Sequence, residues 1–99
     1  LVPVHKVEDL TNGPPHVERE LALVKIVNKG DSRIESLRIA DSFRARILDS
    51  SLNSFVFELT GASDKVSAFI DLMESLGKVE VARTGICGIT RGNKIDLAD

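Results

Sequence analysis

The stretch ELALVKIVN at residues 20–28 determines how this chain folds. Apolar residues fill both sets of alternate positions, and Lys25 is the only charge in its middle. As a β-strand, this segment would be apolar on both faces. A strand of that kind is covered on both sides in a folded protein. We therefore predict a central strand over residues 18–28.

Two helices are expected after this strand, where apolar residues recur every three or four positions. The first is predicted over residues 33–47, with Asp31 or Ser32 as a polar N-cap. The second is predicted over residues 63–76 with Ser63 as its N-cap, and Gly77 stands where a left-handed residue commonly ends a helix.

Three further strands complete the pattern. Apolar runs at residues 47–52 and 54–59 predict a hairpin, and a last strand begins at Val79 and is expected to loosen at Gly85 and Gly88. From residue 18 onward the order is β-α-β-β-α-β. This order is typical of the α+β, ferredoxin-like fold, in which an antiparallel four-stranded sheet carries both helices on one face.

The other face of such a sheet is left open, and here it includes a strand that is apolar on both sides. An exposed apolar face of this size indicates a partner. We expect a second copy of the chain, packed sheet to sheet in a homodimer. The predicted contacts of that dimer are Ala22, Val24 and Ile26.

The first dozen residues are predicted to form a separate unit. Residues 1–10 alternate in part and contain Pro3, which is compatible with an edge strand. Residues 11–15 hold the densest cluster of turn-forming residues in the chain and are predicted to be a linker. Since ten residues cannot fold alone, this strand must pair with another element.

Composition excludes several classes of protein. Ninety-nine residues, 42% of them hydrophobic, allow one domain with its own core. A net charge of −2, no Trp, no Tyr and only four Phe argue against nucleic-acid binding. The longest apolar run, residues 21–24, is far shorter than the roughly 20 residues that span a bilayer. We expect a cytoplasmic protein without a membrane or nucleic-acid partner.

Residues suited to catalysis or metal binding are scarce. The single cysteine, Cys87, cannot form an internal disulfide and is predicted to be a buried, inert thiol. His16, Glu18 and Glu20 share one strand face, which permits a metal site but is more typical of a solvated strand end. Two glycine-containing segments near the carboxyl end do not fit a phosphate-binding loop, because neither opens a helix. We therefore predict no catalytic, cofactor-binding or metal-binding residue.

A set of short strings carries further information. They are KVEDLT (6–11), HVERELALVKI (16–26), FRARILD (43–49), VEVARTG (79–85) and RGNKI (91–95). Through these strings the chain resembles, over nearly its whole length, the regulatory small subunit of acetolactate synthase.

The resemblance implies a division into two parts. In that family an amino-terminal ACT domain binds the feedback inhibitor, usually valine, and a ferredoxin-like domain follows it. Residues 1–12 are then expected to be the last strand of a truncated ACT domain plus the linker, and residues 13–99 the carboxy-terminal domain. The helix and glycine-rich turn that form the effector pocket are not found in this sequence. Valine binding is therefore expected only together with the missing amino-terminal domain.

The resemblance also implies a partner. The catalytic large subunit is a separate chain that holds thiamine diphosphate, Mg²⁺ and FAD and serves branched-chain amino-acid synthesis. We expect the present chain to activate that subunit and to relay valine inhibition, with no cofactor of its own. The expected subunit contacts are exposed charged residues: Arg19, Glu20, Arg83 and Arg91.

Two other functions stay open from the residues alone. A stand-alone small-molecule or metal sensor of the same fold would hold its ligand at a dimer interface near His16, Glu18 or Arg19. An acylphosphatase-like enzyme needs an arginine in an anion-cradling loop with an asparagine nearby. Asn28 and Arg33 are the nearest approximation, and they do not form that motif.

Overall fold

The structure, a computed structural model, describes residues 16–93, which form two helices and five strands. In chain order they are β1 His16–Val27, α2 Asp31–Ser42, β2 Arg46–Ser50, β3 Ser54–Gly61, α3 Ser63–Glu74, β4 Lys78–Arg83 and β5 Cys87–Thr90. The strand predicted for residues 1–10 and the linker at 11–15 lie outside the described residues. Within 16–93, neither helix is long and apolar enough to cross a membrane.

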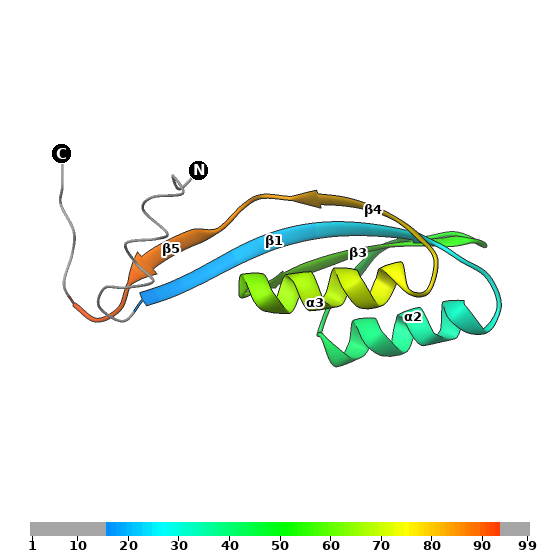
Figure 1. Cartoon of the computed structure of the whole chain (residues 1–99), viewed down its shortest axis with the longest axis horizontal. Helices are drawn as coiled ribbons and strands as arrows, with labels where there is room; N and C mark the ends of the chain where they lie inside the picture. The colour runs from blue at the N-terminus through cyan, green and yellow to red at the C-terminus, as the bar shows by residue number, and fades with distance from the viewer. Residues whose placement is uncertain (1–15, 94–99) are drawn as a thin grey trace.

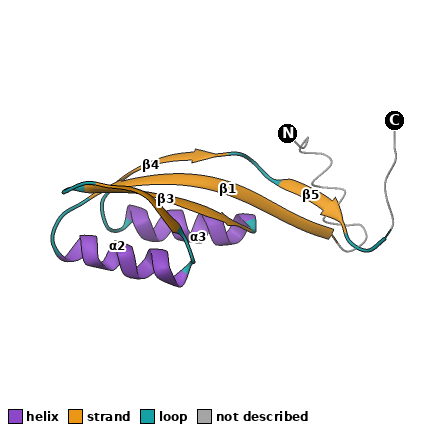
Figure 2. Ribbon diagram, turned by 180° about the vertical axis from the view of Figure 1, so that it is seen from behind, coloured by secondary structure: helices purple, strands orange, loops and turns teal. Residues whose placement is uncertain are grey.

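The sheet has the strand order of the predicted fold. The order is β2-β3-β1-β4 with antiparallel neighbours, and both helices lie on one face of the sheet (Figure 1, Figure 2). β1 is the central strand, since it pairs with β3 on one side and with β4 on the other. The ferredoxin-like α+β prediction is therefore confirmed.

A fifth strand goes beyond the prediction. The first four residues of β1 pair with β5, from His16 opposite Thr90 to Arg19 opposite Cys87. We call these two paired segments, residues 16–19 and 87–90, the β1–β5 ribbon. Figure 1 shows that the ribbon projects beyond the ends of both helices. Between β4 and β5, Gly85 has a φ of 88°, a backbone conformation that glycine adopts without steric cost.

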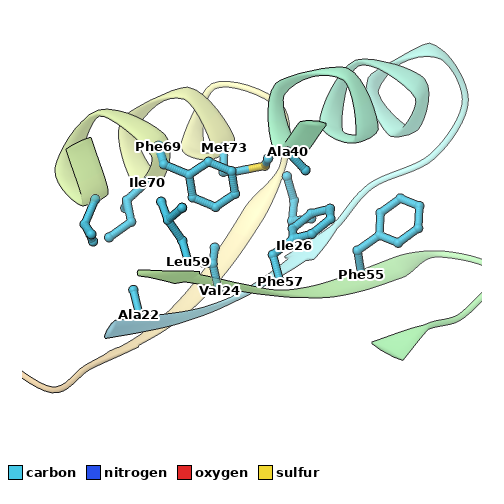
Figure 3. Close-up of a cluster of buried hydrophobic side chains, with 11 residues drawn as sticks. Ala22, Val24, Ile26, Ala40, Phe55, Phe57, Leu59, Phe69, Ile70 and Met73 are labelled. Carbon is cyan, nitrogen blue, oxygen red and sulfur yellow. The ribbon is translucent and has the colours of Figure 1, made fainter. Parts of the chain in front are cut away.

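The core lies between the two helices and the sheet face that they cover (Figure 3). Its members are Ala22, Val24, Ile26, Ala40, Phe55, Phe57, Leu59, Val66, Phe69, Ile70 and Met73. The Phe57 ring packs edge-on to the Phe69 ring at 6.0 Å between centroids. The Phe69 ring in turn meets Phe43 at 5.4 Å. Aromatic contacts thus join β3 to α3, and α3 to the end of α2.

The prediction that Ala22, Val24 and Ile26 lie on the open face is wrong. All three are fully buried beneath the helices, and the alternate residues of β1 face outward. Because both sets are apolar, hydrophobicity alone does not decide which face is covered. Lys25 decides it, since an ammonium group buried under the helices would lose its hydration without compensation.

Both helices end before the predicted residue. α2 stops at Ser42 instead of residue 47, because Arg44 adopts a left-handed φ of 60°. The Arg44 N–H donates to the Asp41 carbonyl at 3.1 Å, and the Ala45 N–H donates to the Ala40 carbonyl at 2.8 Å. This pair of bonds is the Schellman motif that closes many helices.

The predicted N-caps are also wrong. Gly30 occupies the N-cap position of α2 and Ala62 that of α3, and neither makes a side-chain capping bond. Gly77 does not have a positive φ. It allows close packing instead, because a Cβ atom there would lie 2.5 Å from the Val27 carbonyl oxygen.

Candidate functional site

The helices leave the other face of the sheet uncovered, as Figure 2 shows. A shallow hollow lies on this open face, lined by Leu23, Lys25, Val56, Glu80, Val81 and Ala82. Leu23 is 38% exposed. Two ion pairs, Lys25–Glu80 at 3.4 Å and Arg46–Glu58 at 3.5 Å, lie on this face. An apolar centre with charged side chains around it is typical of a protein–protein contact.

A partly buried ion pair joins β1 to β4 at the base of the ribbon. Arg83 Nε donates to Glu20 Oε2 at 3.1 Å, and Arg83 Nη2 donates both to Glu20 Oε1 and to the Ser67 hydroxyl on α3. The Glu20 side chain is only 5% exposed. Arg83 of β4, which is itself bonded to α3, therefore holds the Glu20 carboxylate of β1 in place.

The charges of this pair stabilise each other. The hydrogen bonds from Arg83 lower the pKa of Glu20 below its ordinary value of 4.5, although burial opposes the shift. The Gly85 N–H and the Ser63 side chain lower the pKa of Glu20 further. The bonds with Glu20 also raise the pKa of Arg83. Glu20 is therefore ionised at neutral pH.

The structure separates the four predicted subunit contacts into two groups. Glu20 and Arg83 bond each other at the junction between the ribbon and the rest of the sheet. Arg19 is exposed on the ribbon itself, and Arg91 is exposed directly after β5. The expectation that all four are exposed is wrong for Glu20, which is buried. Arg83 is exposed but is bonded to Glu20, whereas the exposed Arg19 and Arg91 both belong to the projecting part of the molecule.

The three residues considered for a metal site do not act together. His16 Nε2 lies 3.3 Å from Glu18 Oε2, while Glu20 is engaged by Arg83. Between residues 16 and 93, no group of three His, Cys, Asp or Glu side chains is placed to hold a metal ion. The prediction of a buried thiol is wrong, because Cys87 is exposed on β5, where no helix covers the ribbon.

A buried polar contact between β1 and α2 was not predicted. Asn28 Nδ2 donates to the Ser36 hydroxyl at 2.7 Å and to the Ser32 carbonyl at 3.1 Å. The Ser36 hydroxyl donates to the same carbonyl at 2.9 Å. The position of Ser36, four residues before the buried Ala40, was the signal that it faces the core.

The residues considered for an acylphosphatase-like site are engaged elsewhere. The guanidinium carbon of Arg33 lies 3.9 Å from the centroid of the Phe55 ring. Arg33 also donates to the Ser54 carbonyl and to the Ser50 hydroxyl. Because Asn28 bonds to α2 instead, the two side chains do not form a shared anion site.

These features define a ferredoxin-like α+β domain: a covered core on one side, an open sheet face on the other, and a ribbon that extends the sheet. A sequence profile of the family described as "Small subunit of acetolactate synthase" matches residues 19–92. The chain belongs to the acetolactate synthase small-subunit family.

Individual relatives agree with this assignment. The chain is 47% identical to a probable acetolactate synthase small subunit of Archaeoglobus fulgidus, over 95% of this chain and 58% of that protein. It is 44% identical to the Aquifex aeolicus small subunit, over 92% of this chain and 47% of that one. The crystal structure of the Thermotoga maritima small subunit matches with a TM-score of 0.74 at 40% identity, covering 81% of this chain and 49% of that chain. The chain thus spans about half the length of these relatives.

Proposed function

We propose that this chain acts in the cytoplasm as the carboxy-terminal part of a regulatory subunit of acetolactate synthase. In this role it binds and activates the catalytic large subunit and relays feedback inhibition by valine. The observation that carries the proposal is the family match over residues 19–92. The reaction then takes place on the large subunit, which we expect to hold thiamine diphosphate, Mg²⁺ and FAD.

Activation of this kind is a coupling free energy between two chains, typically about 1–3 kcal/mol. It requires the regulatory chain to bind the active conformation of its partner more tightly than the inactive one. An interaction domain satisfies this requirement without catalytic groups, because only surface complementarity is needed.

The open sheet face supports a second part of the proposal, a homodimer. Leu23, Val56 and Ala82 supply an apolar centre that a second copy would cover. The neighbouring Lys25 and Glu80 carry both signs of charge, so two copies related by a two-fold axis can face each other without like-charge repulsion. Valine binding is expected only when the amino-terminal domain is present.

Titration of the purified large subunit with this chain tests the proposal. The rate of acetolactate formation is measured at increasing concentrations of the chain, with and without valine. We expect a saturable rise in rate and, by calorimetry, little binding of valine to this chain alone. No binding and an unchanged rate would refute the regulatory role. Micromolar valine affinity of the isolated chain would refute the expected dependence on the amino-terminal domain.

A further inference from the structure

The β1–β5 ribbon extends the sheet past the helices that cover the rest of it. β3 ends at Gly61, opposite Glu20, so residues 16–19 of β1 pair with β5 and with no second strand among residues 16–93. Figures 1 and 2 show from opposite sides that neither helix reaches the ribbon. A two-stranded structure this short is marginally stable by itself in water. Contacts at its base must therefore hold it.

Those contacts fix the ribbon to the rest of the fold. The Leu21 N–H donates to the Thr84 hydroxyl at 3.1 Å, and the Thr84 N–H donates to the Leu21 carbonyl at 3.0 Å. Beside them, the Glu20–Arg83 ion pair joins β1 to β4, and Arg83 also bonds to Ser67 of α3. The ribbon is therefore presented in one orientation, which reduces the ordering cost of binding a partner.

One face of the ribbon combines apolar and basic side chains. Val17 lies opposite Ile89 and Arg19 lies opposite Cys87, and the alternation of β-strands places both pairs on one face. This face continues the one that carries Leu23. Ile89 is 71% exposed, the second most exposed large apolar side chain in the described part of the chain. The ribbon therefore adds an exposed apolar surface to the open face, beyond the part of the sheet that the helices cover from behind.

The charge of this surface favours an acidic partner. On the open face, Lys25 and Arg46 are each paired with a glutamate. Arg19 and Arg91, by contrast, form no ion pair with any residue from 16 to 93. The guanidinium of Arg19 donates to the Glu18 carbonyl at 2.7 Å. Unpaired arginines beside an exposed isoleucine complement a surface that is apolar at its centre and acidic around it.

We propose that the β1–β5 ribbon is the arm by which this chain docks on the catalytic subunit. On that subunit an apolar depression receives Ile89, and acidic side chains beside it pair with Arg19 and Arg91. This inference rests on the proposed function and names the surface that performs it. The chain then uses two different surfaces: the hollow on the open face binds a second copy, and the ribbon binds the catalytic subunit.

The test uses the full chain and the purified catalytic subunit. The concentration of chain that gives half-maximal activation is measured for the Arg19→Glu/Arg91→Glu double variant and for Ile89→Ser. We expect this concentration to rise about tenfold or more in each case, and the salt dependence of binding to weaken in the double variant. Arg38→Glu is the matched control, because it reverses an exposed arginine on α2, away from the ribbon, and should leave the concentration unchanged.

Thermal melting and the oligomeric state show whether each variant keeps the wild-type fold. If charge reversal unfolds the chain, Arg19→Gln and Arg91→Gln replace it and should raise the half-maximal concentration in the same direction. Weaker activation by folded ribbon variants, with the control unchanged, supports the assignment. Equal activation by the wild type and all ribbon variants overturns the docking arm and leaves the proposed function intact. A wild-type chain that does not bind the catalytic subunit overturns both.

Discussion

Glu20 is the residue that links the ribbon to the body of the domain. Because Arg83 lowers its pKa, the folded state binds a proton at Glu20 less readily than the unfolded state does. The resulting stabilisation is fully present above the ordinary pKa of 4.5. It is lost as the pH falls through the lower pKa of the folded state.

Glu20→Gln should remove this dependence on pH. At neutral pH we expect a loss of about 1–3 kcal/mol in the free energy of unfolding, because Arg83 loses its buried counter-charge. Urea unfolding measured from neutral pH down to about pH 3 should show the wild type and variant converging once the pH falls below 4.5. Glu35→Gln, the same change at an exposed i, i+3 pair, should have a much smaller effect. A difference that stays constant with pH would show that the charge of Glu20 does not contribute.

Gly77 is a residue whose role is steric. In Gly77→Ala the new methyl group would lie 2.5 Å from the Val27 carbonyl oxygen and 3.0 Å from the Asn28 Cβ, so the β1 and β4 ends must separate. We expect a loss of about 1–3 kcal/mol in chemical unfolding. Gly61→Ala is the control, since its methyl group meets only the flexible side chain of Lys65. Equal stability of the two variants would contradict the close packing at Gly77.

At the scale of elements, α2 shows where sequence patterns stop being informative. The apolar stripe of Leu37, Ala40, Phe43 and Ile47 predicts a helix, and a helix is present, but it ends at Ser42 and Ile47 belongs to β2. Its end depends on Arg44 in the left-handed region, and arginine gives no sign of that conformation in a sequence. The N-cap predictions are wrong for a related reason. Serine and aspartate suggested side-chain capping bonds, but Gly30 and Ala62 occupy the N-cap positions and make none.

Arg44→Gly should stabilise the protein, because glycine adopts the left-handed conformation without strain. The expected gain is up to about 1 kcal/mol in urea unfolding, reduced by the greater entropy of glycine in the unfolded chain. Arg46→Gly is the matched control and should destabilise, since it places glycine within β2 and removes the ion pair with Glu58. A loss of stability in Arg44→Gly would mean that the arginine side chain contributes more than its strain costs.

At the scale of the whole molecule, the number and order of the strands that form the four-stranded sheet followed from periodicity. Periodicity did not predict which face of β1 the helices cover, because both sets of its side chains are apolar. The ribbon was missed because the glycines after Thr84 suggested that the last strand loosens. Of the residues predicted as subunit contacts, Arg19 and Arg91 are exposed, and their role stays a prediction. No pattern in the sequence indicates that Glu20 and Arg83 bond each other. Such a contact between residues 63 positions apart depends on tertiary structure.

The proposed dimer predicts a separation of assembly from folding. Leu23→Asp should give a monomer with a melting temperature close to that of the wild-type protomer, because the side chain lies on the open face. Leu72→Asp changes a leucine of similar exposure, 41%, on α3 and should leave the oligomeric state unchanged. Light scattering after size-exclusion chromatography distinguishes the two. An unaltered dimer in Leu23→Asp would place the interface elsewhere.

The central position of β1 also affects how the domain is made. β1 is synthesised before β3, β4 and β5, so none of the strands that flank it exists when it leaves the ribosome. Until the last of them emerges, a strand apolar on both faces is open to pairing with other nascent chains. Lys25, in the middle of that strand, places a charge where self-association would otherwise begin. The lysine that sets which face of the sheet is covered thus also protects the strand during synthesis.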